Sequence, residues 1–305
     1  MLTSLPPEII QAILTQLPTA SLFNFSLTCR NSRDLARGAL RTLVLGVFSS
    51  RVNGLISFME SSHDCSTHAV AVVLERRLTK SKRQVIENQN HAAAAVLLKH
   101  GHSIRDLELL LWEPQTSVVV ALVEMKNLRR LSLNFDHPHT RHSRLEKSYW
   151  AEAPPGTIWN WLAATPSGEG MFGRLESLWL RRAGLTDYQL DQIIRRNPRI
   201  RDLRLQKCLN LTHHFFKYLA KSPIARSLET LHFTQHDGVE IDNRILPYLA
   251  CFPSLKNLSL YRCSNVGNEA VKRLNAATWH ITHLSLPYCI DSPPTGRLEV
   301  DPAYK

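Results

Sequence analysis

Histidine and cysteine are the residues of this chain whose types and spacing could support metal binding or nucleophilic catalysis. His137, His139 and His142 could supply three metal ligands within six residues, and His213 with His214 could add two more. Structural zinc sites usually complete their ligand shell with cysteine pairs, however, and the chain has no Cys-x-x-Cys sequence. We therefore interpret the histidine-rich segment as a solvated loop, and we predict no metal and no cofactor.

The cysteines show no catalytic arrangement either. Cys208, Cys263 and Cys289 each lie three residues after the last apolar residue of a repeated motif, a position that suits a small buried side chain. The six cysteines of the chain form no dense disulfide framework, which favours a reduced protein. Walker, HExxH and GxSxG motifs are absent, and no GxGxxG follows a predicted strand. The sequence thus predicts a protein that is not an enzyme.

The element that must position any functional residue is a repeat. Its pattern is an apolar residue, two free positions, an apolar residue, one free position and a third apolar residue. Successive copies begin 24 to 28 residues apart, except for one step of 47, and this period is typical of leucine-rich repeats. Such repeats bury their apolar face only by stacking, which leaves one face of each strand free. The seven copies are Ile104-Leu107-Leu109, Leu128-Leu131-Leu133, Leu175-Leu178-Leu180, Ile200-Leu203-Leu205, Leu228-Leu231-Phe233, Leu255-Leu258-Leu260 and Ile281-Leu284-Leu286.

The residues between the pattern positions point to the free face, because successive side chains on a strand alternate. From the third copy onward this face carries aromatic residues together with arginine and histidine, which are common anchors of protein–protein interfaces. A tryptophan at position 179 is poorly explained by a face that only meets water. We predict a binding surface for a protein substrate, and acidic or phosphorylated groups suit this surface because arginine pairs well with them. Its predicted residues are Trp179, Arg181, Arg204, His232, Tyr261 and His283.

The array begins near residue 40 by the same reasoning. Leu40, Leu43 and Leu45 repeat the spacing, and residues 70–74 form a second β-branched strand candidate. A helix is predicted between Lys82 and Lys99, with Gly101 at its end. These segments predict two irregular repeats before Ile104, and a separate α/β domain over residues 40–100 is the alternative. An insertion at about 134–173 interrupts the array, and residues 291–305 form a tail rich in turn-forming residues.

Residues 1–40 do not fit the repeat and predict three short helices. Leu5, Pro6, Glu8, Ile9 and Ile10 open the first helix, in which proline suits the first turn and Glu8 suits the positive end of the dipole. Three helices of this length bury too little apolar surface to be stable alone. The segment also contains Ile13-Leu14, Leu17-Pro18, Leu22 and Ser26-Leu27-Thr28-Cys29-Arg30, in this order.

These residues resemble an F-box, and an F-box followed by leucine-rich repeats is similar to the substrate receptors of cullin-based SCF ubiquitin ligases. The resemblance implies that the first 40 residues bind a Skp-family adaptor, and through it a cullin, while the repeats hold a protein substrate. One position departs from the pattern, because Ser32 lies where many F-boxes have a tryptophan. The adaptor contact falls on Leu5, Pro6, Ile9, Ile10, Ile13 and Leu14, although some of these residues must instead pack the segment itself.

Charge and hydropathy set the remaining limits. The net charge of +11 favours an acidic partner, nucleic acid or anionic lipid, but no dense run of lysine and arginine marks a nucleic-acid arm. No stretch reaches eighteen apolar residues and the N-terminus lacks a signal-peptide pattern, so we predict a cytoplasmic or nuclear protein that does not bind membranes.

The predicted fold class is therefore α/β, with a three-helix F-box at residues 1–40 and a leucine-rich-repeat solenoid at 41–290. Its parallel strands line the concave face and its helices the convex face. The predicted function is non-catalytic substrate recognition in a ubiquitin ligase. The alternatives are a repeat scaffold without a ligase link and a basic repeat protein that binds nucleic acid.

Overall fold

The structure is a computed structural model of the chain. It describes residues 5–48, 68–74, 82–110, 115–135, 157–164, 173–208, 210–234, 241–263, 265–279, 281 and 283–285. The chain forms two compact units, of which the first comprises residues 1–146 and 165–175 and the second residues 147–164 and 176–305. None of the described helices is long and apolar enough to cross a membrane.

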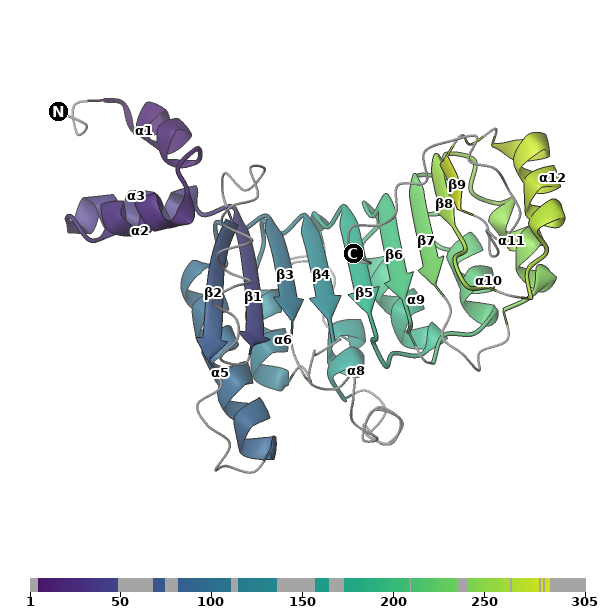
Figure 1. Cartoon of the computed structure of the whole chain (residues 1–305), viewed down its shortest axis with the longest axis horizontal. Helices are drawn as coiled ribbons and strands as arrows, with labels where there is room; N and C mark the ends of the chain where they lie inside the picture. The colour runs from purple at the N-terminus through teal and green to yellow at the C-terminus, as the bar shows by residue number, and fades with distance from the viewer. Residues whose placement is uncertain are drawn as a thin grey trace. The chain divides into compact units, whose positions relative to one another are not determined.

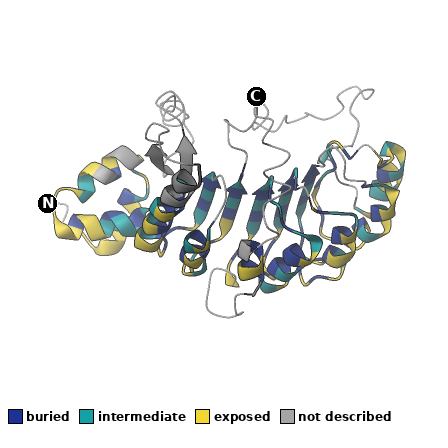
Figure 2. Cartoon of the chain, turned by 90° about the horizontal axis from the view of Figure 1, so that it is seen from below, coloured by how far each residue is buried: buried dark blue, intermediate teal, exposed yellow. Residues whose placement is uncertain are grey.

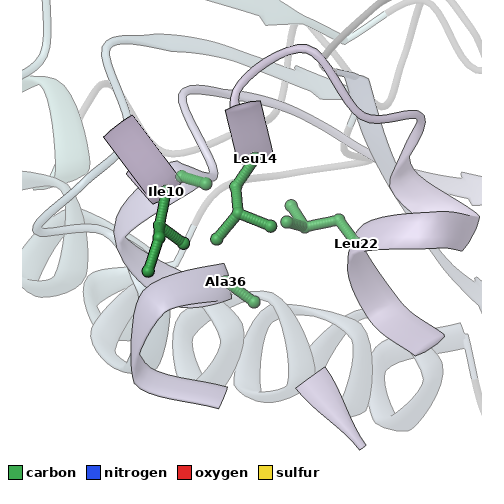
Figure 3. Close-up of a cluster of buried hydrophobic side chains, with 5 residues drawn as sticks. Ile10, Leu14, Leu22 and Ala36 are labelled. Atoms are coloured by element: carbon green, nitrogen blue, oxygen red, sulfur yellow. The ribbon is translucent and has the colours of Figure 1, made fainter. Parts of the chain in front are cut away.

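The first unit begins with the three predicted helices, α1 (Pro7–Leu14), α2 (Thr19–Ser26) and α3 (Arg30–Ala39). Prolines occupy the N-cap positions of α1 and α2, and the Cys29 thiol caps α3 by accepting a hydrogen bond from the Ser32 amide at 3.4 Å. Each helix contributes to one small core (Figure 3). The residues of this core are Ile10, Leu14, Leu22, Ala36 and Ala39.

A parallel sheet follows in the first unit, with α5 (Lys82–His100) and α6 (Thr116–Val123) on one of its faces (Figures 1 and 2). Gly101 ends α5 because its amide bonds to the Leu97 carbonyl at 2.6 Å, and a side chain at residue 101 would collide with that oxygen. The strands are β1 (Thr42–Phe48), β2 (His68–Leu74), β3 (Asp106–Leu110) and β4 (Arg130–Asn134).

The strand order of this sheet is β2-β1-β3-β4, an order that the prediction of two irregular repeats before Ile104 left open. Both predicted strands exist, but β1 pairs with β3 as well as with β2. The chain therefore leaves β1, adds β2 at the edge, and returns through α5 to extend the sheet on the other side of β1.

The three helices are joined to this sheet by polar contacts. The Ser103 hydroxyl donates a hydrogen bond to the Arg37 carbonyl of α3 at 2.7 Å. The Arg41 guanidinium in turn donates a hydrogen bond to the Ser103 carbonyl at 3.3 Å. The Arg105 amide donates to the Arg41 carbonyl at 2.7 Å, which continues the β1–β3 ladder back toward α3. The three helices, which are too small to be stable alone, are thus hydrogen-bonded to the sheet of the first unit.

The second unit stacks five described strands in chain order, all parallel, and its helices cover one face of them (Figures 1 and 2). The α9 helix begins at a capping box in which Thr186 and Gln189 each accept the other's amide hydrogen. The strands are β5 (Ser177–Arg181), β6 (Asp202–Gln206), β7 (Thr230–Thr234), β8 (Asn257–Ser259) and β9 (His283–Ser285). The helices are α8 (Thr157–Ala164), α9 (Asp187–Arg196), α10 (His214–Ala220), the 3-10 turn η3 (Asn243–Ile245), α11 (Leu246–Leu249) and α12 (Asn268–Thr278).

The pattern positions form the core, as the repeat predicts. Leu203, Leu205 and Leu231 are fully buried, while the residues that alternate with them are mostly half-buried (Figure 2). Phe215 and Phe216 of α10 pack against Phe233 of β7, with ring centroids 6.3 and 5.2 Å away. The predicted fold class, helices followed by a leucine-rich-repeat-like α/β solenoid, is thus confirmed, with strands on one face of each unit and helices on the other.

Cysteines at two of the predicted inward turns lie close to backbone carbonyls of the preceding strand. The Cys208 thiol lies 3.6 Å from the Leu180 carbonyl of the preceding strand, and the Cys263 thiol lies 4.0 Å from the Phe233 carbonyl. Burial raises the pKa of the Cys208 thiol to about 12, so this group remains protonated and inert. The third predicted position, Cys289, lies outside the described residues.

The boundaries predicted at residues 40, 134, 173 and 290 stay predictions. Most of the insertion and all of the tail lie outside the described residues, and only α8 and the residues at the insertion's ends are seen. The buried Gln189 of α9 donates to the Asn160 side chain of α8 at 2.7 Å, so α8 packs as a covering helix of the second unit.

Candidate protein-binding surfaces

The first candidate surface is the apolar side of α1 that the small core leaves uncovered. Ile9 and Ile13 lie one helical turn apart and expose 49% and 42% of their surface, and Leu5 exposes 39%. Ile10 and Leu14 lie on the other side of the same helix and are buried against α2 and α3 (Figure 3). The α1 helix thus has two apolar stripes, one buried in the core and one exposed to solvent. An exposed apolar stripe of this kind is typical of a protein-binding surface.

The predicted adaptor residues therefore divide into two groups. Leu5, Pro6, Ile9 and Ile13 lie at the surface, whereas Ile10 and Leu14 belong to the core of the three-helix segment. Leu27, one of the residues on which the resemblance to an F-box rests, is 62% exposed and is a further candidate contact. Both pairs have the i, i+4 spacing of one helical turn, so the sequence indicates two apolar stripes on α1 but not which of them faces α2 and α3.

Ser32, near the position where many F-boxes have a tryptophan, is a buried residue in the first turn of α3. Its hydroxyl lies 3.1 Å from the Cys29 thiol, and its amide caps the helix through the same sulfur. These hydrogen bonds lower the pKa of the Cys29 thiol. A small polar residue is thus accommodated by local hydrogen bonds rather than by aromatic packing.

The second candidate surface is the strand face of the second unit that is turned away from the helices. Parallel register places Trp179 beside Arg204, and Arg204 beside His232, in one row across β5, β6 and β7. Ser259 of β8 continues this row. Three of the six predicted substrate residues therefore lie side by side, about 4.8 Å apart from strand to strand.

The contact between Trp179 and Arg204 organises the centre of this row. The Arg204 guanidinium carbon lies 5.8 Å from the centre of the indole ring, within cation–π range. Arg204 Nε also donates to Asp202 Oδ1 at 3.0 Å, which fixes the guanidinium on the tryptophan. The indole N–H of Trp179 is shielded from solvent and has no hydrogen-bond acceptor among the described residues.

His232 belongs to a polar chain at the end of the row. Its Nε2 atom lies 3.0 Å from Thr234 Oγ1 and 3.4 Å from the Gln206 side-chain nitrogen. Gln206 and Thr234 are almost fully buried, so this chain holds the imidazole in place from two neighbouring strands. A histidine positioned in this way can offer one ring nitrogen to a partner.

The other three predicted residues do not share that row. Arg181 is the register partner of Gln206, two residues beyond the pair of Trp179 and Arg204. Tyr261 follows the end of β8, and the Arg262 guanidinium lies 5.6 Å from its ring centre. His283 pairs with Asn257 in the row before Trp179, and its side chain lies outside the described part of the structure. The six predicted residues thus comprise three in one central row and three outside that row.

Metal-binding geometry is not found in the described part of the chain, where no three His, Cys, Asp or Glu side chains are grouped to hold an ion. His213 and His214 lie with ring centroids 4.1 Å apart, and burial together with the charge of His214 lowers the pKa of His213. The histidines at 137, 139 and 142 lie outside the described residues.

Comparison with known proteins identifies the N-terminal helices. Residues 2–41 match the F-box domain. A comparison with curated proteins found no significant match. The chain thus carries an F-box domain at its N-terminus, followed by parallel α/β units with a leucine-rich-repeat-like fold, and F-box proteins are generally non-catalytic adaptors.

Proposed function

We propose that this protein is the non-catalytic substrate-recognition subunit of an SCF-type ubiquitin ligase, acting in the cytoplasm or nucleus. The F-box domain binds a Skp-family adaptor and through it a cullin, and the strand face of the second unit binds a protein substrate. The observation that carries the proposal is the combination of an F-box match at residues 2–41 with an α1 helix that has one apolar side buried and the other exposed.

Two substitutions test the adaptor contact. Ile9→Asp with Ile13→Asp would place two unpaired carboxylates in a desolvated interface, which costs more than about 3 kcal/mol, or over 100-fold in affinity. The measurement is binding of the purified full chain to a purified Skp-family adaptor, with circular dichroism to verify folding. Asn24→Asp with Asn31→Asp adds the same charge at exposed positions of α2 and α3 and serves as the control. Unchanged adaptor binding by a folded Ile9/Ile13 variant would refute the assignment.

A second set of variants tests the substrate surface. Trp179→Ala, Arg204→Ala and Tyr261→Ala together remove the aromatic and cationic groups of the strand face. We expect this variant to lose the proteins that co-purify with the wild type while it retains the adaptor, because anchor residues of this kind dominate interface energies. The control is Tyr188→Ala, Arg199→Ala and Tyr218→Ala, which also removes two aromatic residues and one arginine, from exposed positions outside the strands. An unchanged substrate set in the first variant would exclude this face.

The same purified proteins distinguish the proposed function from its two alternatives. A repeat scaffold without a ligase link would carry its partners on the strand face but would not bind adaptor. A nucleic-acid-binding repeat protein would be retained on nucleic acid with a steep dependence on salt.

A further inference from the structure

The junction between the F-box domain and the sheet of the first unit is polar. The small core of the F-box domain is made of residues from α1, α2 and α3. Several of the described hydrogen bonds that join this domain to the sheet involve one buried residue, Ser103. Its hydroxyl lies 2.7 Å from the Arg37 carbonyl of α3 and 3.1 Å from the His100 carbonyl at the end of α5. The end of α5 is therefore part of the junction.

The side chain of His100 is half-buried at this junction. Its Nδ1 atom is shielded from solvent and has no hydrogen-bond partner among the described residues. The neutral imidazole fits such a place, because one of its ring nitrogens carries no hydrogen. The charged imidazole carries a hydrogen on both nitrogens, so it would leave a shielded N–H donor without an acceptor. The geometry of the junction therefore favours neutral His100.

The charges that act on His100 are all positive. They belong to Lys99 on the same helix, Arg37 on α3 and His102 in the loop after α5. Together with the burial of the ring, these cations lower the pKa of His100. The carboxylate of Asp34 on α3 is 73% exposed and lies 3.4 Å from the Arg37 guanidinium. A proton on His100 would thus meet cations from both sides of the junction.

The starts of β1 and β3 add further positive charge beside the junction. Arg41 precedes β1 and Arg105 precedes β3, and the Arg105 amide donates to the Arg41 carbonyl at 2.7 Å. Burial and the neighbouring charge of Arg105 lower the pKa of the Arg41 guanidinium. The carboxylate at the start of β3, Asp106, already accepts two hydrogen bonds from Arg130 at 2.6 and 2.8 Å. These residues therefore give a protonated His100 no compensating anion.

We propose that His100 is a pH-sensitive switch that controls the contact between the F-box domain and the repeats. While the imidazole is neutral, α3 stays hydrogen-bonded to the end of α5 through Ser103. Protonation opens this contact, because the imidazolium is solvated and separated from Arg37 only when α3 moves away. The contact is complete above the ordinary histidine pKa of about 6.5 and is lost as the pH falls through the lower pKa of the closed state. Acidification therefore frees the F-box domain to move relative to the repeats.

Hydrogen exchange of the full chain, followed by mass spectrometry, tests the switch because it measures local opening. The reporter peptides cover residues 36–41 and 100–106, which form the two sides of the junction, and reference peptides cover β6 and β7. Exchange is compared at pH 7.5 and pH 5.5 after correction for the intrinsic pH dependence of amide exchange. One proton taken up near pH 6.5 can raise the opening constant by at most about tenfold over this interval. We expect a several-fold rise at the junction of the wild type and no rise in β6 and β7.

Three variants identify the group that titrates. His100→Asn cannot be protonated, so opening of its junction should agree within about twofold at the two pH values. Arg37→Gln removes the cation that α3 presents to His100 and should reduce the pH response. His102→Asn is the matched control, because it removes an exposed histidine from the same loop and should retain the wild-type response. Thermal unfolding at pH 7.5 verifies that each variant is folded.

Several results would overturn the inference. They are a wild-type junction that does not open at pH 5.5, an equal rise in β6 and β7, and a His100→Asn variant that responds as the wild type does. A response that is lost in His102→Asn but kept in His100→Asn would overturn it as well. If His100→Asn does not fold, Arg37→Gln decides, since an unchanged response there would exclude the proposed repulsion. Every readout comes from the chain alone, so failure of adaptor binding would refute the proposed function without affecting this test.

Discussion

Leu203 offers the sharpest test of the repeat architecture, because the next residue in the chain points to the opposite face. Leu203 is fully buried between its register partners Leu178 and Leu231. Leu203→Ala removes three carbon atoms, which is worth about 2.4 kcal/mol of transfer free energy, and the cavity left behind raises the cost to about 2–5 kcal/mol. The thermal midpoint of unfolding should fall by about 3–8 °C for a chain of this size, because the entropy of unfolding is about 2.1 cal/mol/K per residue.

Arg204→Ala is the matched control for this experiment. Arg204 contributes an ion pair with Asp202 in which the two side chains are 42% and 28% exposed, and such pairs contribute about 0–1 kcal/mol. The assay is thermal and urea unfolding followed by circular dichroism in both variants and the wild type. Equal destabilisation by Leu203→Ala and Arg204→Ala would refute the assigned facing of β6, and so would a loss below about 1 kcal/mol for Leu203→Ala.

Two further predictions follow from titratable groups. Burial, together with the charge of Lys99, lowers the pKa of His100 in the folded protein. Neutral His100 therefore stabilises the fold fully above its unfolded pKa of about 6.5, and this stabilisation is lost as the pH falls through the lower pKa of the folded state. The His100→Asn variant should thus lose less thermal stability than the wild type between pH 7 and pH 5. Iodoacetamide at pH 8 should alkylate Cys29, whose pKa is lowered by Ser32, well before Cys208, whose pKa is raised to about 12, and peptide mapping that found Cys208 modified as early in the native protein would contradict its burial.

The strands of the repeats could be predicted from the sequence because each carries its own signal. A triplet such as Leu203, Leu205 and the preceding Ile200 fixes both the strand and its buried face, since alternation is a local property. The order β2-β1-β3 could not be predicted in this way. Both β1 and β2 are short apolar strands, and the choice of which one pairs with β3 depends on contacts far apart in sequence.

The candidate surfaces were predictable to a similar extent. Trp179 and Arg204 occupy the same offset within their repeats, so their neighbouring positions follow from the pattern alone. The division of α1 into Ile9 and Ile13 outside and Ile10 and Leu14 inside required the positions of α2 and α3.

The strand order of the first unit determines where the F-box domain is attached. Terminal elements of repeat proteins open most easily, because each has a neighbour on one side only. Here the terminal strand is β2, and the strand that follows the F-box domain is β1, which is flanked on both sides. Only Leu40 and Arg41 separate α3 from β1. Fraying at this end of the array would therefore leave the tether of the F-box domain anchored in an intact part of the sheet.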